Sequence, residues 1–383
     1  MKSETPAKME VPDTMKRSLL LLVFFLTYVY TPAPPPSLQA KSIPNASQVS
    51  DGICTPEIAN VKGNAIVQFL EETLKDLRDP ATDPVAYRAS LYSDRQQMKE
   101  AAQALQEALS ICRNLAKANP ARYQAGVALA LHNLAILYTR MQQMKDAELA
   151  FQEALTIRRN LAKANPTAYE PGVAATLHQL GVLYAESNRT KEAEQAYRQA
   201  LTIRRDLARF NPAAHQPEVA MTLYNLADLY TVTRRIKEAE QDFQEALAIQ
   251  TELAKTNPAA YQFYVAMTLN KLGTLYKDTR QWKRAERTFQ EALLIYRDLA
   301  ISNPAAHQPY VATILNHLAN LYGKTERLKE AEQAHQEALL ILWGLAKANP
   351  IFEDDVATTL HDWASLYSEK KPTTKPRKPT ETR

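Results

Sequence analysis

Residues 131–155 read LHNLAILYTRMQQMKDAELAFQEAL and contain two apolar stripes at the spacing of an α-helix. In the first half, Leu131, Leu134 and Ala135 are followed by Tyr138, at i, i+3, i+4 and i+7, which places all four on one helix face. The second half contains a similar stripe of small and large residues: Ala147, Phe151, Ala154 and Leu155. The stretch therefore predicts two helices whose small residues allow close packing while Tyr and Phe fill the gap between them.

This pattern recurs along the chain at a fixed interval. The dipeptide Asn-Pro begins at positions 46 residues apart: Asn119, Asn165, Asn211, Asn257, Asn303 and Asn349. The tyrosine recurs with the same period: Tyr92, Tyr138, Tyr184, Tyr230, Tyr276, Tyr322 and, after a one-residue deletion, Tyr367. Self-similarity at a constant period is typical of a solenoid, in which each repeat packs against its neighbours.

The prolines suggest where the helices end. We expect the second helix of this pair to run from about Met144 to Ala164 and to stop at Asn-Pro, because proline disfavours helix in the residue before it. The next first helix is expected to begin about five residues later. Pro171, Pro217 and Pro309 would then stand in a first turn, where proline is tolerated.

The arrangement small-x-x-Tyr followed by Ala-x-x-x-Phe-x-x-Ala resembles the tetratricopeptide repeat (TPR). The resemblance covers about residues 85–369, and the 46-residue period is similar to the longer repeat of kinesin light chains. It implies an all-α fold, a right-handed superhelical solenoid of antiparallel helix pairs, with the first helices lining a concave groove. HEAT or armadillo repeats have comparable periods but would not explain the small-residue and Tyr columns.

The repeat count defines the domain organisation. Residues 85–369 are predicted to form six repeats plus a carboxy-terminal capping helix around 355–369, with a polar outer face. Residues 58–84 alternate apolar and charged side chains at helical spacing and are predicted to be an amino-terminal capping helix. Residues 41–57 are interpreted as a linker.

The amino terminus has the features of an export signal. Residues 19–30 form an apolar run of 12, too short to span a bilayer, which needs ~20 residues. The run follows Lys16 and Arg17 and precedes a Pro-rich stretch that ends at Ala40. We therefore expect residues 1–40 to be a signal peptide cleaved after Ala40, which predicts a periplasmic or secreted protein without a stable membrane span. The alternative is an uncleaved signal anchor that tethers the protein to a membrane.

The positive charge lies at the carboxy terminus. The chain has a net charge of +4, but residues 370–383 carry +5 and residues 41–369 carry −2. A nucleic-acid-binding domain concentrates positive charge on its folded surface, so no nucleic-acid partner is expected. The Pro- and Thr-rich segment 370–383 is interpreted as a basic disordered tail.

No catalytic or metal-binding pattern stands out. The eight glycines never form G-x-G-x-x-G or a phosphate-binding loop, and no H-E-x-x-H, C-x-x-C or G-x-S-x-G motif occurs. We therefore predict a protein that is not an enzyme, without cofactor or metal. His132, His178 and His361 share one repeat column; they could form an imidazole ladder for a metal or a carboxylate, or a column that simply tolerates polar residues. Export would permit Cys54 and Cys112 to pair, a question that the sequence leaves open.

The predicted binding surface consists of polar columns on the first helices. Amide side chains both donate and accept hydrogen bonds, so they can hold the backbone of an extended peptide. The candidate groove residues are His132, Asn133, His178, Tyr224, Asn225, Asn270, Lys271, Asn316 and Asn320. The sequence thus favours a non-enzymatic scaffold that binds a peptide or protein in its concave groove. The alternative is a structural or surface-attachment protein that acts through its convex face or its basic tail.

Overall fold

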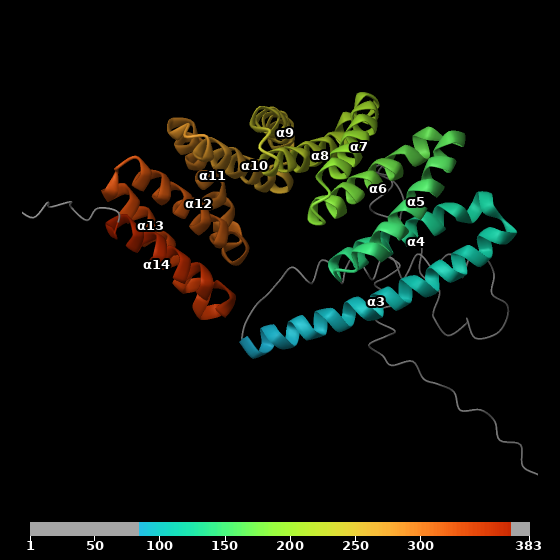
Figure 1. The fold of residues 1–383 in the computed structure, drawn as a ribbon, viewed down its shortest axis with the longest axis horizontal. Coiled ribbons are helices and arrows are strands. Elements are labelled where there is room, and N and C mark those ends of the chain that lie inside the picture. Colours follow the sequence, from blue (N-terminus) through green and yellow to red (C-terminus); the bar gives the residue numbers. More distant parts are fainter. Residues whose placement is uncertain (1–83, 369–383) are drawn as a thin grey trace, which may run out of the picture. The chain divides into compact units, whose positions relative to one another are not determined.

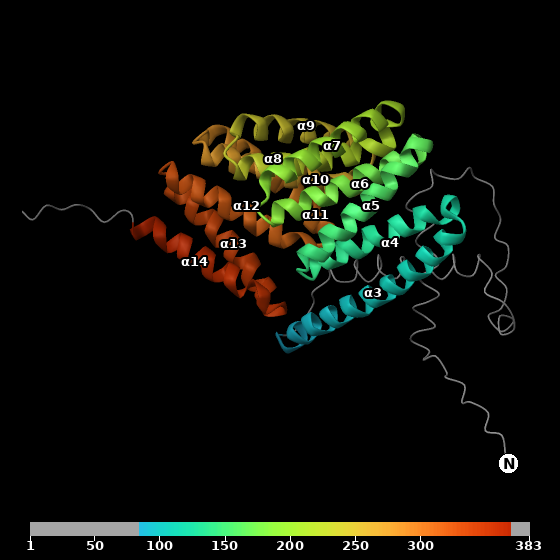
Figure 2. The ribbon, with the colours of Figure 1, turned by 45° about the vertical axis from the view of Figure 1, so that its right-hand side comes forward.

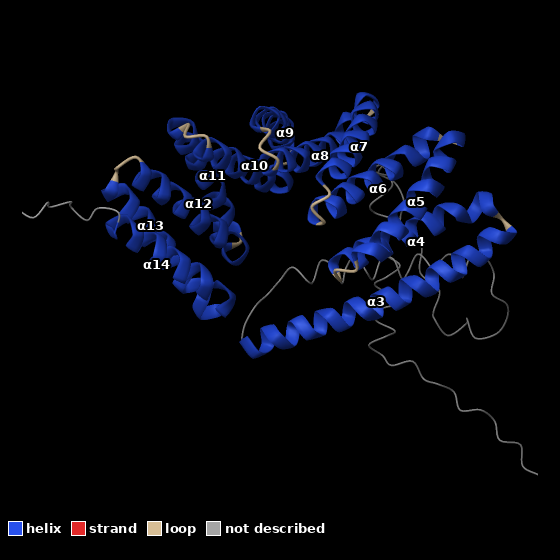
Figure 3. Cartoon of the chain, in the orientation of Figure 1, coloured by secondary structure: helices blue, strands red, loops and turns tan. Residues whose placement is uncertain are grey.

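The chain folds entirely into helices over the part that the structure describes. The computed structural model describes the backbone of residues 84–368 and the side chains of residues 97–366. Within that range, short connections join the helices and no strand is present (Figure 3). Residue contacts divide the described part of the chain into two compact units: Ala89–Ser187 forms one, and Asn188–Arg383 together with Ala81–Arg88, at the start of α3, forms the other. The predicted signal peptide 1–40, linker 41–57 and tail 370–383 lie outside the described residues, as does the predicted capping helix 58–84 apart from Pro84.

Each unit is a series of helices in which neighbours in sequence pack together (Figure 1). The first unit contains α3 (Pro84–Ala118, from Ala89 onward), α4 (Pro120–Arg140), α5 (Met144–Ala164) and α6 (Pro166–Glu186). The second contains α7 (Thr190–Phe210), α8 (Pro212–Val232), α9 (Ile236–Thr256), α10 (Pro258–Asp278), α11 (Trp282–Ser302), α12 (Pro304–Lys324), α13 (Leu328–Ala348), the 3₁₀ turn η2 (Pro350–Phe352) and α14 (Glu353–Ser368). The predicted all-α solenoid is confirmed.

The repeated Asn-Pro both ends one helix and begins the next. Helix α5 ends at Ala164 as predicted, and the Asn165 side chain then accepts a hydrogen bond from the backbone N–H of Ala168, which caps α6. Pro166 occupies the first helical position, where no backbone donor is needed. The prediction that the first helices start about five residues after Asn-Pro was therefore wrong, because one asparagine serves both helices. Pro171, Pro217 and Pro309 consequently lie inside helices rather than in their first turns.

A left-handed residue makes the turn inside each helix pair. Non-glycine residues with φ of about 60° recur every 46 positions: Gln142, Asn188, Arg234, Arg280 and Glu326. This conformation brings the next residue's N–H back to the preceding helix, as when Arg327 donates to the backbone oxygen of Tyr322 at 2.8 Å. The turn is thus the same in each pair although its residues differ.

The repeated apolar columns form the core. Ala147, Phe151 and Ala154 on α5 are almost fully buried, and the corresponding Ala239, Phe243 and Ala246 on α9 are buried to the same extent. His335 occupies the large-residue column on α13, is fully buried, and has no hydrogen-bond partner at Nε2.

The first predicted repeat differs from the others. Its tyrosine column, Tyr92, predicted a turn shortly after that residue, but α3 is one continuous helix of 35 residues. The first helices α4, α6, α8, α10 and α12 are each 21 residues long, and the stretch of sequence corresponding to them, 74–94, contains Pro80 and Pro84. Over the described residues, one uninterrupted helix thus stands where a turn was expected.

The last described helix, α14, has a partly apolar exposed side. Helix α14 lies where the carboxy-terminal capping helix was predicted, beside α13 (Figure 2). Its exposed side is mixed: Leu360 is 41% exposed and Ala357 and Ala364 are exposed as well, beside the exposed polar residues Glu353, Asp354, Asp355, Thr358 and His361.

Candidate functional site

Two of the predicted groove histidines are enclosed rather than presented to a ligand. His132 and His178 are 8% and 3% exposed. The His132 ring packs edge-on against Phe151 at 5.5 Å, and burial followed by the charge of Arg158 holds its pKa well below the usual value. Neither imidazole is presented to solvent in this structure, because both rings lie at contacts between helices.

Other predicted groove residues bond to side chains on neighbouring first helices. Lys271 Nζ on α10 lies 2.6 Å from Asp228 Oδ1 on α8, and Asn270 Oδ1 lies 3.0 Å from His317 Nδ1 on α12. Asn316 and Asn320 on α12 donate to Thr359 and Asp362 on α14, at 2.7 and 2.8 Å. Asn133 Nδ2 in the first unit is buried without a partner. These side chains link successive first helices, so much of their hydrogen-bonding capacity is used internally.

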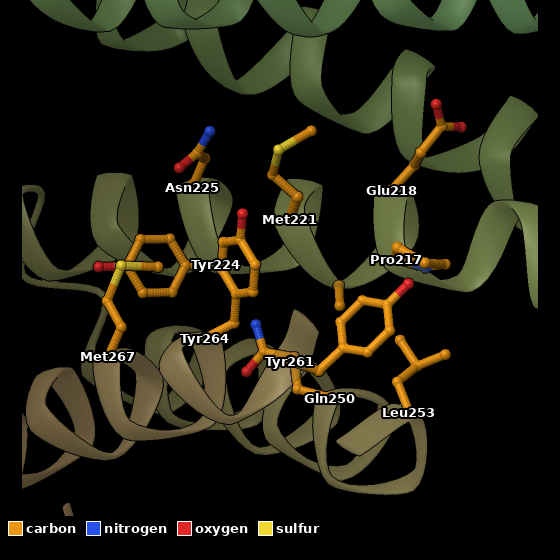
Figure 4. A pocket seen from close by; sticks show the side chains of 11 residues that line it. Pro217, Glu218, Met221, Tyr224, Asn225, Gln250, Leu253, Tyr261, Tyr264 and Met267 are labelled. Atoms are coloured by element: carbon orange, nitrogen blue, oxygen red, sulfur yellow. The ribbon is translucent and has the colours of Figure 1, made fainter. Parts of the chain in front are cut away.

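Tyr224 and Asn225 do line a hollow. A cavity of about 340 Å³ lies in the second unit between α8 and α10, beside the last turns of α9. Figure 4 shows the rings of Tyr261 and Tyr264 extending from α10 toward α8, where Pro217 and Met221 lie. The lining residues are Pro217, Glu218, Ala220, Met221, Tyr224, Asn225, Gln250, Leu253, Tyr261, Tyr264 and Met267.

A change at one buried position explains why the cavity occurs here. The second helices carry a buried column 46 residues apart: Arg158, Arg204, Gln250, Tyr296 and Leu342. Arg204 reaches the hydroxyl of Thr222, whereas Gln250 is shorter and accepts from Thr268 at 2.7 Å. One repeat later Tyr296 stacks on Tyr310, with ring centroids 5.1 Å apart. Gln250 thus leaves open the space that larger side chains fill in the repeats on either side.

The cavity wall is aromatic and nearly neutral. Glu218 is the one lining residue with a formal charge, and its Oε2 lies 3.9 Å from Nε of the buried Arg204 and 3.4 Å from His215 Nδ1. Burial, followed by the charge of Asp228, raises the pKa of Tyr224 above its usual value, so the phenol stays protonated. Tyr264 and Met221 are 45% and 43% exposed and form the mouth. Such a wall suits an uncharged apolar group.

Sequence reasoning missed most of this lining. The signal was a departure from the repeat: the column of Tyr264 holds Gly126 and Gly172 in the first unit and Glu218 on α8. In the same way, Phe263 replaces the proline found at Pro171, Pro217 and Pro309 and contacts Tyr264, Tyr296, His307 and Tyr310. Large aromatic residues at these positions are confined to α10 and α12.

No group of three or more His, Cys, Asp or Glu side chains within the described range could hold a metal ion. Across that same range, none of the helices combines the length and the apolar character needed to cross a membrane.

Comparison with known proteins defines the family. Tetratricopeptide-repeat models match residues 127–166 and 173–208, and also 218–298 and 264–342. This chain belongs to the tetratricopeptide-repeat family, whose members generally act as protein-interaction scaffolds rather than enzymes.

Solved structures resemble it at low sequence identity. The crystal structure of BtubC (BKLC) from P. vanneervenii is 23% identical with a TM-score of 0.54, over 65% of this chain and 92% of that chain. A putative kinesin light chain from Podosopora anserina with nearly identical TPR-like repeats is 18% identical with a TM-score of 0.46, over 59% of this chain and 98% of that chain. No curated protein matches this chain. At this identity the first similarity shows the fold alone.

Proposed function

We propose that this protein is a scaffold that binds an extended segment of a partner protein across the first helices of its second unit. An uncharged apolar side chain of that segment is held in the cavity between α8 and α10. The observation that carries the proposal is the cavity of about 340 Å³ lined by Tyr224, Tyr261 and Tyr264. Tyrosine is favoured in binding sites because its large rigid ring buries much area at low entropic cost. Asn225 and Gln250 add amide groups at the same wall.

We also propose a compartment in which the scaffold acts. A cleaved signal peptide at 1–40 would deliver the scaffold to the periplasm or the exterior, and an uncleaved anchor would hold it at a membrane. Amino-terminal sequencing of the mature protein distinguishes the two.

A cavity-filling variant tests the binding site. The double substitution Gln250→Tyr with Thr268→Ile copies the pair that the protein itself uses one repeat later, Tyr296 with Ile314, so the fold should be retained. Peptides are selected from a displayed library on the wild-type full chain and then measured on the double variant by fluorescence anisotropy.

Selected peptides should share an apolar anchor residue and bind the double variant about tenfold or more weakly, since losing one buried large side chain costs over ~1.4 kcal/mol. A matched control is the exposed Leu294 on α11, away from the cavity; Leu294→Ala should leave affinity unchanged. Equal affinity for the wild type and the double variant would refute the cavity as the anchor site.

A further inference from the structure

Helix α14 carries an apolar packing face whose counterpart is buried on every other first helix of the second unit. On α12 the residues Ala312, Leu315 and Ala319 are 0%, 3% and 0% exposed, in an extensive contact with α13. The corresponding residues of α14, after the one-residue deletion, are Ala357, Leu360 and Ala364. All three are exposed, and Leu360 reaches 41%.

The opposite face of α14 is packed in the usual way. Val356 and Thr359 are buried, and Asn320 of α12 donates to Asp362. These correspond to residues through which each first helix contacts the repeat before it. Helix α14 is therefore a first helix docked on its predecessor, with the face for its own second helix left open.

The residues that follow do not suit that second helix. In the preceding repeat the second helix begins six residues after Tyr322, at Leu328. The corresponding stretch from Thr373 contains Pro376 and Pro379 and no apolar residue other than proline. Proline inside a helix costs ~3 kcal/mol or more, and a helix without an apolar stripe has nothing to bury against Leu360.

We infer that α14 is a docking site for an amphipathic helix supplied by another protein, which takes the place of the seventh second helix. The known pairs define the chemistry of this helix: alanine, an aromatic residue four positions on, then Ala-Leu, as in Ala147, Phe151, Ala154 and Leu155 of α5. The stretch Glu353–Ser368 contains four carboxylates and no Lys or Arg, with Glu353, Asp354 and Asp355 in its first turn. An antiparallel partner would place its carboxyl end there, so that end should be basic, as Lys163 is in α5.

A peptide taken from this chain provides the probe. Residues 144–164 carry the stripe and a basic carboxyl end, and binding of the labelled peptide to the full chain is measured by fluorescence anisotropy. Leu360→Asp should weaken binding by about tenfold or more, because a carboxylate would be buried in the contact. Thr358 is exposed on α14 but lies off the stripe, so Thr358→Asp should leave binding unchanged. The thermal unfolding midpoint of each variant is measured as well, and an unchanged midpoint shows that the fold is retained.

A covalent version tests the same face without dependence on peptide affinity. In a chimera, the sequence of residues 144–164 replaces 373–383, so that it follows α14 directly. The chimera should unfold at a higher temperature than the wild type and should no longer bind the free peptide. Three results would each overturn the inference: peptide binding unaffected by Leu360→Asp, a chimera no more stable than the wild type, or a wild-type dimer in sedimentation that Leu360→Asp converts to a monomer, which would make the occupant a second copy.

Discussion

Acid should destabilise the second unit through His317. This side chain on α12 lies against Phe289 with ring centroids 5.1 Å apart, and its Nδ1 is 3.0 Å from Asn270 Oδ1. Burial, followed by the charge of Lys277, lowers the pKa of His317 from 6.5 to about 4. The folded state therefore resists protonation that the unfolded chain accepts freely. As pH falls below 6.5 the unfolded chain binds more protons, so the free energy of unfolding decreases, and this loss continues down to about pH 4.

The size of the effect follows from the shift. A difference of one pKa unit corresponds to ~1.4 kcal/mol, so between pH 7 and pH 5 His317 alone should remove about 2 kcal/mol from the free energy of unfolding. His307 and His335, which lie in the same unit, also have pKa values lowered mainly by burial and add to the decrease in the same direction.

The three tryptophans make this measurable in the second unit. Trp282, Trp343 and Trp363 all lie there, so urea unfolding followed by tryptophan fluorescence reports on that unit. His317→Asn places in this column the residue found at Asn225 and should reduce the loss between pH 7 and pH 5 by about 2 kcal/mol. The same substitution at the exposed His361 controls for removal of one imidazole. An unchanged pH dependence in His317→Asn would refute the reasoning.

Three further substitutions should change stability in known directions, each measured as the midpoint of thermal unfolding by circular dichroism. Gly344→Ala, inside α13 with nothing within 4 Å of an added Cβ, should stabilise by roughly 0.5–1 kcal/mol, and a lower midpoint would contradict this. Glu326→Gly should also stabilise, by up to ~1 kcal/mol, because φ of 62° suits glycine. Asn165→Ala should cost about 1 kcal/mol through loss of the cap on Ala168; an unchanged midpoint would show that Pro166 alone starts α6.

Helix pairs and their core could be predicted from the sequence because the same packing requirement recurs in every repeat. The column of Phe151 must fill the gap opposite small residues, and five equal Asn-Pro intervals fix the register of the whole stack. The bounds of α5 were predicted to the residue. The start of α6 was not, because an asparagine that ends one helix can also cap the next, and spacing alone does not separate the two roles.

The binding surface was harder to predict, and His132 shows why. A periodic apolar stripe reveals one buried face, but a first helix packs against the second helix before it as well as its own. His132 is enclosed by a further neighbour, because its ring faces Phe151 on its own second helix α5 and its Nδ1 lies 3.4 Å from Thr176 Oγ1 on the next first helix, α6. Polar residues are accepted there because buried polar groups can find partners. The cavity itself depends on the length difference between Gln250 and its column neighbours, which a polarity pattern does not register.

A binding site in such a stack should lie where the repeats differ, since residues that are the same in every repeat serve the helix packing that every repeat shares. The Ala239 column is alanine in every repeat and lets the helices pack closely, whereas the columns of Gln250 and Tyr264 change side-chain size or chemistry along the chain. Where Gln250 is smaller than Arg204 and Tyr296, the stack contains a cavity. The same logic applies to α14, whose inner face keeps the repeat while its outer face lacks the expected covering. Both departures expose apolar surface that the regular repeats bury, which is the property that a second polypeptide can use.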